Sequence, residues 1–163
     1  MAAAVEPEKP WLELYRYWLG KHVDGRPPAR RDLDPPLEIP ALVARLMLIE
    51  LVGGEFMYRL VGSEVARYLA ADITGKAVGR SSWAPEQVKS EWRRMITTVT
   101  DRQRPHMAIT LPAPGNSRTG FCLALPLVDS TGATEQVLIG IFSDREGFGS
   151  KELNGIDVFE FAP

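Results

Sequence analysis

Cysteine and histidine are scarce in this sequence, which contains one cysteine and two histidines among 163 residues. The single cysteine, Cys122, cannot form a disulfide within the chain, and this fits a reducing compartment. His22, His106 and Cys122 are far apart in sequence and match no recognised zinc-ligand spacing. We therefore predict neither a disulfide framework nor a metal site.

The chain also lacks a long hydrophobic run and an excess of charge of one sign. No stretch approaches the ~20 apolar residues that a membrane helix needs, and the N-terminal MAAAVEPEKP lacks the apolar run of a secretory signal. Nineteen basic and 21 acidic residues give a net charge of −2, so nothing favours binding to nucleic acid or to an anionic membrane. We expect a soluble, cytoplasmic protein.

Motifs of common catalytic and nucleotide-binding sites are missing. The stretch GKAVGR lacks the GK[ST] ending of a phosphate-binding loop, and no G-x-S-x-G elbow occurs. Asp72 and Asp101, at expected helix ends, are more readily caps or solvated groups than general bases. We therefore name no catalytic residue and no cofactor, and we do not expect an enzyme.

What is present is typical of one globular domain. The sequence is 45% hydrophobic and 25% charged, and its length allows a sizeable core. We divide it into an N-terminal aromatic helix with a proline-rich connector (1–36), a main domain (37–143) and a C-terminal tail (144–163). The tail sequence GIDVFEFAP is compatible with a sixth strand, a docking segment or a disordered end.

The first expected element is a helix over residues 10–20, PWLELYRYWLG, with proline in its first turn and glycine at its end. Its helical spacing places four large side chains on one face, and such a face must be covered by the rest of the domain or by a second copy of the chain. We predict a homodimer interface built from Trp11, Leu14, Tyr15 and Trp18. The four prolines of residues 21–36 predict an extended connector.

The main domain is expected to open with a β-hairpin. After a short helical turn at ALVAR, the strand LMLIELV and the alternating strand EFMYRLV flank the glycines at 53 and 54. Alternation puts Phe56, Tyr58 and Leu60 on one face, which we take as the inner one. After Gly62 the period changes from two to about four, which indicates a helix.

A longer helix and three strands complete the pattern. The helix runs from about Pro85 to Asp101, with a buried stripe of Val88, Trp92, Met95, Ile96 and Val99. Strands follow at 106–114, 120–128 and 136–143, separated by turn residues. The order of elements indicates an α+β fold.

Motifs within residues 14–79 are similar to those of a known family. The helix LYRYWLG, the D-x-D-P segment followed by IP, and the hairpin strand YRLVGS resemble the small bacterial PAS-like domain family. The resemblance implies a five-stranded antiparallel sheet with helices on one face, together with the extra N-terminal helix. It also implies that residues 37–143 are a PAS-like domain and that any small ligand lies between the helices and the inner face of the sheet.

We derive candidate ligand-contacting residues from this expected pocket. They are large, adaptable or polar side chains on the inner strands and covering helices: Tyr58, Arg59, Tyr68, Trp83, Trp92, Met95, Phe121 and Leu123. Each also has a plainer interpretation. Tyr58 can bond to a nearby carbonyl, Arg59 can pair with an acid on a neighbouring element, and the apolar residues can be ordinary core.

Cys122 is expected on the opposite strand face from Phe121, Leu123 and Leu125, as a small buried hydrophobe. A flavin-adduct photosensor of the PAS class places its cysteine in a helix-borne motif that this chain lacks, which disfavours covalent light sensing. His106 has haem ligation or a pH-sensitive contact as alternatives to a surface role.

The leading hypothesis is a non-catalytic sensory domain that binds a small molecule or a partner protein and signals by protein contact. A ligand-free dimerisation or adaptor module is the alternative. A small enzyme in a similar α+β shell is disfavoured, because the strand positions expected to face inward are almost all apolar.

Overall fold

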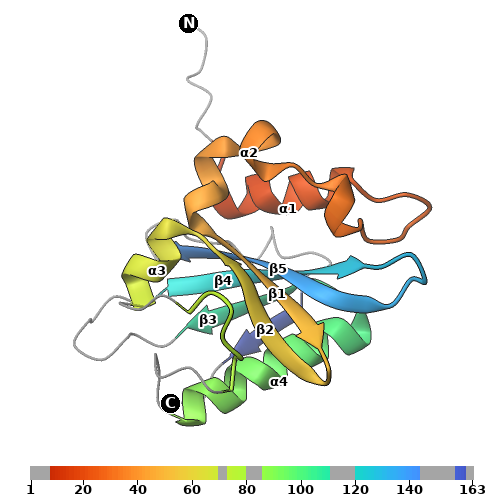
Figure 1. Cartoon of the computed structure of the whole chain (residues 1–163). Coiled ribbons are helices and arrows are strands. Elements are labelled where there is room, and N and C mark those ends of the chain that lie inside the picture. The colour runs from red at the N-terminus through yellow and green to blue at the C-terminus, as the bar shows by residue number, and fades with distance from the viewer. Residues whose placement is uncertain (1–7, 70–72, 80–85, 111–119, 144–156, 161–163) are drawn as a thin grey trace, which may run out of the picture.

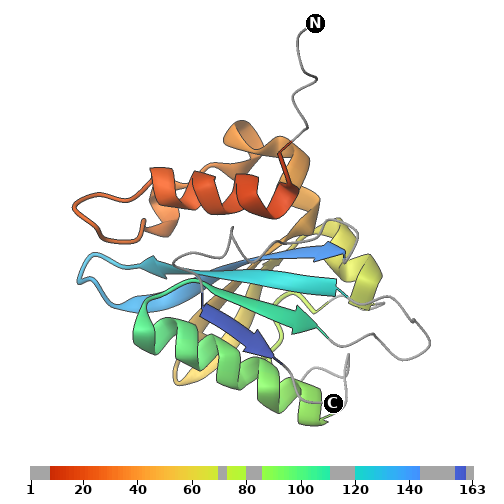
Figure 2. The ribbon, with the colours of Figure 1, turned by 180° about the vertical axis from the view of Figure 1, so that it is seen from behind.

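The structure is a computed structural model of the chain and describes residues 8–69, 73–79, 86–110, 120–143 and 157–160. Figure 1 shows one twisted sheet with helical layers on both sides. Figure 2 gives the same arrangement from behind. The expected α+β class is confirmed.

Five strands form the predicted antiparallel sheet: β1 (Leu46–Val52), β2 (Glu55–Val61), β3 (His106–Thr110), β4 (Gly120–Val128) and β5 (Thr134–Ser143). A sixth strand, β6 (Asp157–Glu160), comes from the tail and pairs in parallel with β3. The spatial order is β2-β1-β5-β4-β3-β6. The long β4 and β5 are therefore central, and both faces of the sheet need a cover.

The β1–β2 hairpin turns through Gly53 and Gly54, whose φ angles of 58° and 83° suit a tight two-residue turn. A bulge then shifts the register, because Leu48 pairs with Leu60 whereas Ile49 pairs with Tyr58. The extra residue in β2 is Arg59. It breaks the alternation, so the expectation that Leu60 shares the inner face with Tyr58 is wrong: Tyr58 is buried, whereas Leu60 is 54% exposed.

The two faces of the sheet carry separate hydrophobic clusters. We call the first the α1-side cluster, formed by Trp11, Leu14, Trp18, Leu33, Ile39, Leu42, Leu46, Leu48, Met107, Phe121, Leu123, Leu125, Leu127, Leu138 and Phe142. We call the second the α4-side cluster, formed by Met47, Ile49, Tyr58, Val65, Ile73, Val78, Trp92, Met95, Ile96, Val99, Ala108, Cys122, Ala124, Val137 and Ile139.

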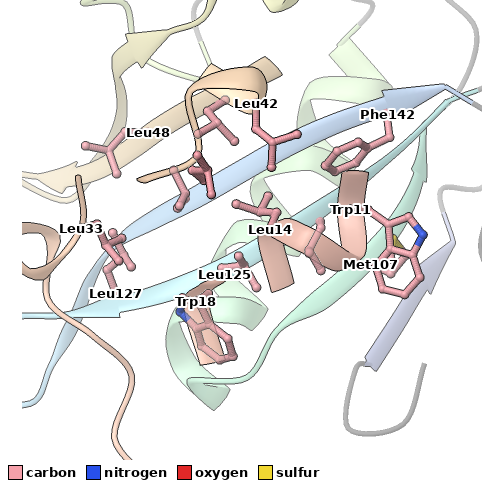
Figure 3. Packing of buried hydrophobic residues seen from close by; sticks show 14 of the residues in the cluster. Trp11, Leu14, Trp18, Leu33, Leu42, Leu48, Met107, Leu125, Leu127 and Phe142 are labelled. Atoms are coloured by element: carbon pink, nitrogen blue, oxygen red, sulfur yellow. The ribbon is translucent and has the colours of Figure 1, made fainter. Parts of the chain in front are cut away.

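Helix α1 (Pro10–Gly20) covers the first face with the predicted stripe. Trp11, Leu14 and Trp18 are at most 3% exposed, and Figure 3 shows them gathered with Leu125 and Phe142 of the central strands. The indole Nε1 of Trp18 donates to the carbonyl of Pro126 at 2.9 Å. These side chains are in one cluster with residues of the central strands, so α1 is part of the core of its own chain.

The connector is more ordered than the expected extended segment. It contains a 3₁₀ turn (Arg30–Asp32) and a short helix, α2 (Pro35–Glu38). The carboxylate Oδ1 of Asp34 caps α2 by accepting from the Leu37 N–H at 3.3 Å, and the two prolines fit the first turn. Leu33 and Ile39 join the α1-side cluster, so packing crosses the proposed boundary at residue 36.

The predicted turn at ALVAR is the 3₁₀ helix η2 (Pro40–Arg45), and the change of period at Gly62 does begin a helix, α3 (Ser63–Leu69). Helix α4 (Glu86–Arg102) covers the second face of the sheet, as Figures 1 and 2 show. Four predicted stripe residues are buried there: Trp92, Met95, Ile96 and Val99. None of the helices in the described ranges has the length and apolarity needed to span a bilayer.

Candidate functional site

The predicted ligand-contacting residues lie on two opposite faces of the sheet. Tyr58, Trp92 and Met95 belong to the α4-side cluster, whereas Phe121 and Leu123 belong to the α1-side cluster. All five are at most 4% exposed. The sheet separates them, so the structure does not bring them together into one site.

The other three candidates have different surroundings. Arg59 is at the β2 bulge, where its Nε lies 2.6 Å from Oε2 of Glu50 on the neighbouring strand. This pair matches the ion-pair alternative for Arg59. Tyr68 is in α3, with its side chain outside the described part of the structure, and Trp83 lies outside the described residues altogether.

An apolar cavity of about 280 Å³ lies between the connector and the hairpin, on the α1 side of the sheet. Its walls come from the 3₁₀ turn, α2, η2, the two hairpin strands and β5. The lining residues are Arg30, Leu33, Pro35, Pro36, Val43, Leu46, Met47, Leu48, Leu60, Val61, Gly62 and Leu138. Leu60 is half-exposed, so its side chain lies where the cavity meets solvent. We call this hollow the connector cavity.

Sequence reasoning missed the connector cavity for two reasons. The connector was expected to be extended, although the Asp34 cap followed by two prolines is a helix-start signal that could have been used. The outward position of Leu60 depends on the bulge at Arg59. A strict alternation along β2 does not predict this position of Leu60.

Gly62 lines the connector cavity at the point where η2 approaches the end of β2. Its N–H donates to the carbonyl of Leu46 at 2.8 Å. A Cβ at this position would lie 2.4 Å from the carbonyl oxygen of Ala44 and 2.8 Å from that of Val43. Only glycine allows η2 and the end of β2 to approach this closely.

Polar side chains at the end of α1 are hydrogen-bonded to α2 beside the cavity. Tyr17 and Lys21 both donate to the carboxylate of Glu38, and the Tyr17 hydroxyl accepts from the Asp34 N–H at 2.9 Å. The hydrogen bonds from Lys21 and Tyr17 lower the pKa of Glu38 to about 2. Burial, followed by the hydrogen bond to Glu38, raises the pKa of Tyr17. We call this cluster the α2 latch.

Replacing Glu38 by glutamine is expected to lower the melting temperature at neutral pH, because both charge-assisted bonds to the carboxylate are weakened. Since folding depresses this pKa from 4.5 to about 2, the stabilisation is present above pH 4.5 and is lost as the pH falls through 2. Thermal melts between pH 7 and pH 2 should show the wild type and Glu38→Gln converging in acid. The exposed Glu135→Gln is the control, and its melting temperature at neutral pH should stay close to that of the wild type. If the difference in melting temperature between the wild type and Glu38→Gln stayed the same from pH 7 to pH 2, the role of the α2 latch would be contradicted.

A second hollow, of about 320 Å³, lies near the tip of the hairpin beside α4. Its lining includes Arg93, whose charge faces Glu86 at 3.7 Å and whose Nη2 donates to Ser90 at 3.3 Å. The cation is therefore already engaged by α4 itself. This hollow offers weaker grounds for a ligand than the connector cavity.

Cys122 lies in the α4-side cluster, on the face of β4 opposite to Phe121 and Leu123, as its strand pattern predicts. Burial raises the pKa of its thiol to about 12. We expect no reaction with a thiol-specific reagent such as iodoacetamide in the native protein and full reaction in urea, because the thiolate is the nucleophile. Mass spectrometry of the alkylated chain tests this, and rapid native labelling would contradict the burial.

The positions of the ionisable side chains show whether the site suits a metal ion or an apolar ligand. The described residues hold no set of three or more His, Cys, Asp or Glu side chains arranged for a metal ion. The connector cavity has apolar walls with one charged lining residue, Arg30. Such a hollow suits non-covalent recognition of an apolar molecule.

The fold is similar to that of a solved PAS domain. The PAS domain of BvgS from Bordetella pertussis has a TM-score of 0.53 at 14% identity, over 74% of this chain and 93% of that one. A sensory box sensor histidine kinase from Vibrio cholerae has a TM-score of 0.49 at 13% identity, over 66% and 90% of the two chains. No curated protein matches.

At 14% identity the likeness to the BvgS domain concerns the fold alone. The family itself is shown by sequence, since the profile of the PAS domain family matches residues 7–142, from before α1 to near the end of β5. That range includes the helix and hairpin motifs that carry the resemblance in the sequence. The chain therefore belongs to the PAS domain family.

Proposed function

We propose that this protein is a non-catalytic sensory domain that binds a small apolar molecule in the connector cavity and signals by protein contact. PAS domains are typically sensory or signalling modules, which sets the general class. The observation that carries the proposal is the cavity itself, about 280 Å³ and lined almost entirely by apolar residues. This volume is near the lower end of the roughly 300–1,000 Å³ common for small-molecule sites.

The position of the cavity supports a signalling role. A molecule inside would touch Leu33 and Pro35 from the connector and Leu48 and Leu60 from the hairpin. The connector and the hairpin are separate segments that meet there. A bound ligand would thus favour conformations in which the connector and the hairpin stay together. A partner protein that binds the N-terminal segment would then distinguish the ligand-bound protein from the ligand-free protein.

Thermal denaturation with octan-1-ol as a probe tests the proposal. Wild-type protein should show a saturable rise in melting temperature, since a ligand that binds only the native state stabilises it. Val43→Phe, at a half-buried lining position, should fill the cavity and abolish the rise. Val52→Phe, at an exposed position outside the lining, is the matched control and should keep it. A rise of equal size in all three proteins would contradict the site.

A ligand-free dimerisation or adaptor module is the second candidate, favoured by one observation. Tyr58, Trp92 and Met95 pack together on the face where the family resemblance places a ligand, and each is at most 4% exposed. Native mass spectrometry of freshly purified protein separates the two functions. Bare dimers support the adaptor, whereas retained small-molecule mass supports the sensor.

A further inference from the structure

We infer that the ligand of the connector cavity carries a single carboxylate on an apolar chain, and that Arg30 binds this carboxylate. The inference rests on the proposed function, because it names the chemical class of molecule for the same cavity. It adds a specificity-determining residue that neither the sequence pattern nor the family resemblance identifies.

Arg30 is the charged member of a lining that is otherwise hydrocarbon, glycine and proline. Its side chain is half-buried, and its Nη1 donates to the carbonyl of Leu33 at 3.0 Å. Leu33 is itself a lining residue. This bond holds the guanidinium at the cavity wall while the planar group retains other N–H donors for an acceptor.

The acids nearest to Arg30 in sequence are engaged elsewhere. Asp32 accepts from the Ala29 N–H at 2.9 Å through Oδ2 and lies 4.0 Å from the Arg31 Nε through Oδ1. Asp34 caps α2. Among the residues that the structure describes, no carboxylate forms an ion pair with Arg30.

A half-buried cation beside an apolar cavity favours an anionic ligand. Arg30 is partly buried at the cavity wall, and an anionic acceptor there would form a charge-assisted hydrogen bond with its guanidinium. A carboxylate matches the fork of the guanidinium with two parallel hydrogen bonds. The apolar walls meanwhile suit a hydrocarbon tail.

The same lining argues against polyanionic ligands. A nucleotide or a phosphorylated sugar needs several donors around its phosphates, whereas the connector cavity offers one cationic side chain. Its limited volume also favours a short or medium chain over a long one. The ligand class is therefore a small monocarboxylate with an apolar tail.

Isothermal titration with octanoate and octan-1-ol, below the concentration at which octanoate forms micelles, tests the inference. The two probes share a tail and differ in the head group. Wild-type protein should bind octanoate more tightly than octan-1-ol. In Arg30→Gln the octanoate affinity should fall on the order of tenfold, while the affinity for octan-1-ol stays within about twofold.

Two further variants control for charge and folding. Arg31→Gln removes an exposed neighbouring charge that does not line the cavity, and it should bind both probes as the wild type does. Arg30→Lys keeps the charge without the planar fork and should fall between the wild type and Arg30→Gln. An unchanged melting temperature of each unliganded variant shows that its fold is intact.

The outcomes separate the two proposals. Equal binding of both probes by the wild type, or equal losses for both probes in Arg30→Gln, would overturn the role of Arg30 and leave the apolar cavity as a ligand site. If neither octanoate nor octan-1-ol binds to the wild type, the proposed function is overturned, and the inference about Arg30 is overturned with it.

Discussion

Replacing Gly62 by alanine is expected to destabilise the protein by about 3 kcal/mol. The added Cβ would lie 2.4 Å from the Ala44 carbonyl oxygen, 2.6 Å from the Ala44 carbonyl carbon and 2.8 Å from the Val43 carbonyl oxygen. All three atoms belong to the backbone of η2, so no side-chain rotation relieves the contact. Either η2 or the end of β2 must shift, and urea unfolding measures the loss.

Gly20→Ala is the matched control for this substitution. Nothing lies within 4 Å of a Cβ at Gly20, at the end of α1, and alanine has the higher helix propensity. We expect its stability within about 0.5 kcal/mol of the wild type. A Gly62→Ala protein equally close to the wild type would show that η2 is not held against the end of β2.

Replacing Trp11 by alanine is expected to cost about 3–5 kcal/mol, the range found for large buried aromatic side chains. Trp11 is fully buried in the α1-side cluster, which also contains Met107 and Phe142, as Figure 3 shows. The same helix supplies the control. Leu19 is 42% exposed, so Leu19→Ala should cost less than about 1 kcal/mol.

The same experiment separates a core role of α1 from a dimer contact. If Trp11 packs within its own chain, the free energy lost in Trp11→Ala is independent of protein concentration. If a second copy covered this face, the melting temperature of the wild type would rise with protein concentration and the variant would lose that dependence. The burial of Trp11, Leu14 and Trp18 within one chain predicts the first result. Among the four predicted interface residues, Tyr15 is only partly buried against this cluster. Its side chain therefore has exposed surface that a second copy could contact.

Local patterns sufficed for the elements that carry strong periodicity. The stripe of Trp11, Leu14 and Trp18 predicted α1, and the glycine pair at 53 and 54 predicted the hairpin turn. The alternation in β4 correctly put Cys122 on one face and Phe121 on the other. In each case the signal lies within a few consecutive residues, since helical and strand periods are properties of the local backbone.

The candidate site was predicted less well, because it depends on how distant segments meet. Phe121 and Tyr58 both suit a pocket wall, yet no sequence period says which face of β4 and which face of β2 are on the same side of the sheet. One extra residue at Arg59 reversed the expected face of Leu60. The role inferred for Arg30 arises from its placement against the hairpin, far along the chain.

The sequence by itself determined the family, the α+β class, the main helices and strands, and the apolar stripes of α1 and α4. The tertiary structure alone decided which chain covers α1, which side chains share a face, and where a cavity remains between the connector and the hairpin. The physical reason is the distance along the chain over which each feature is determined. Backbone periodicity is local, whereas a cavity is the volume that side chains from distant segments leave unfilled when they pack.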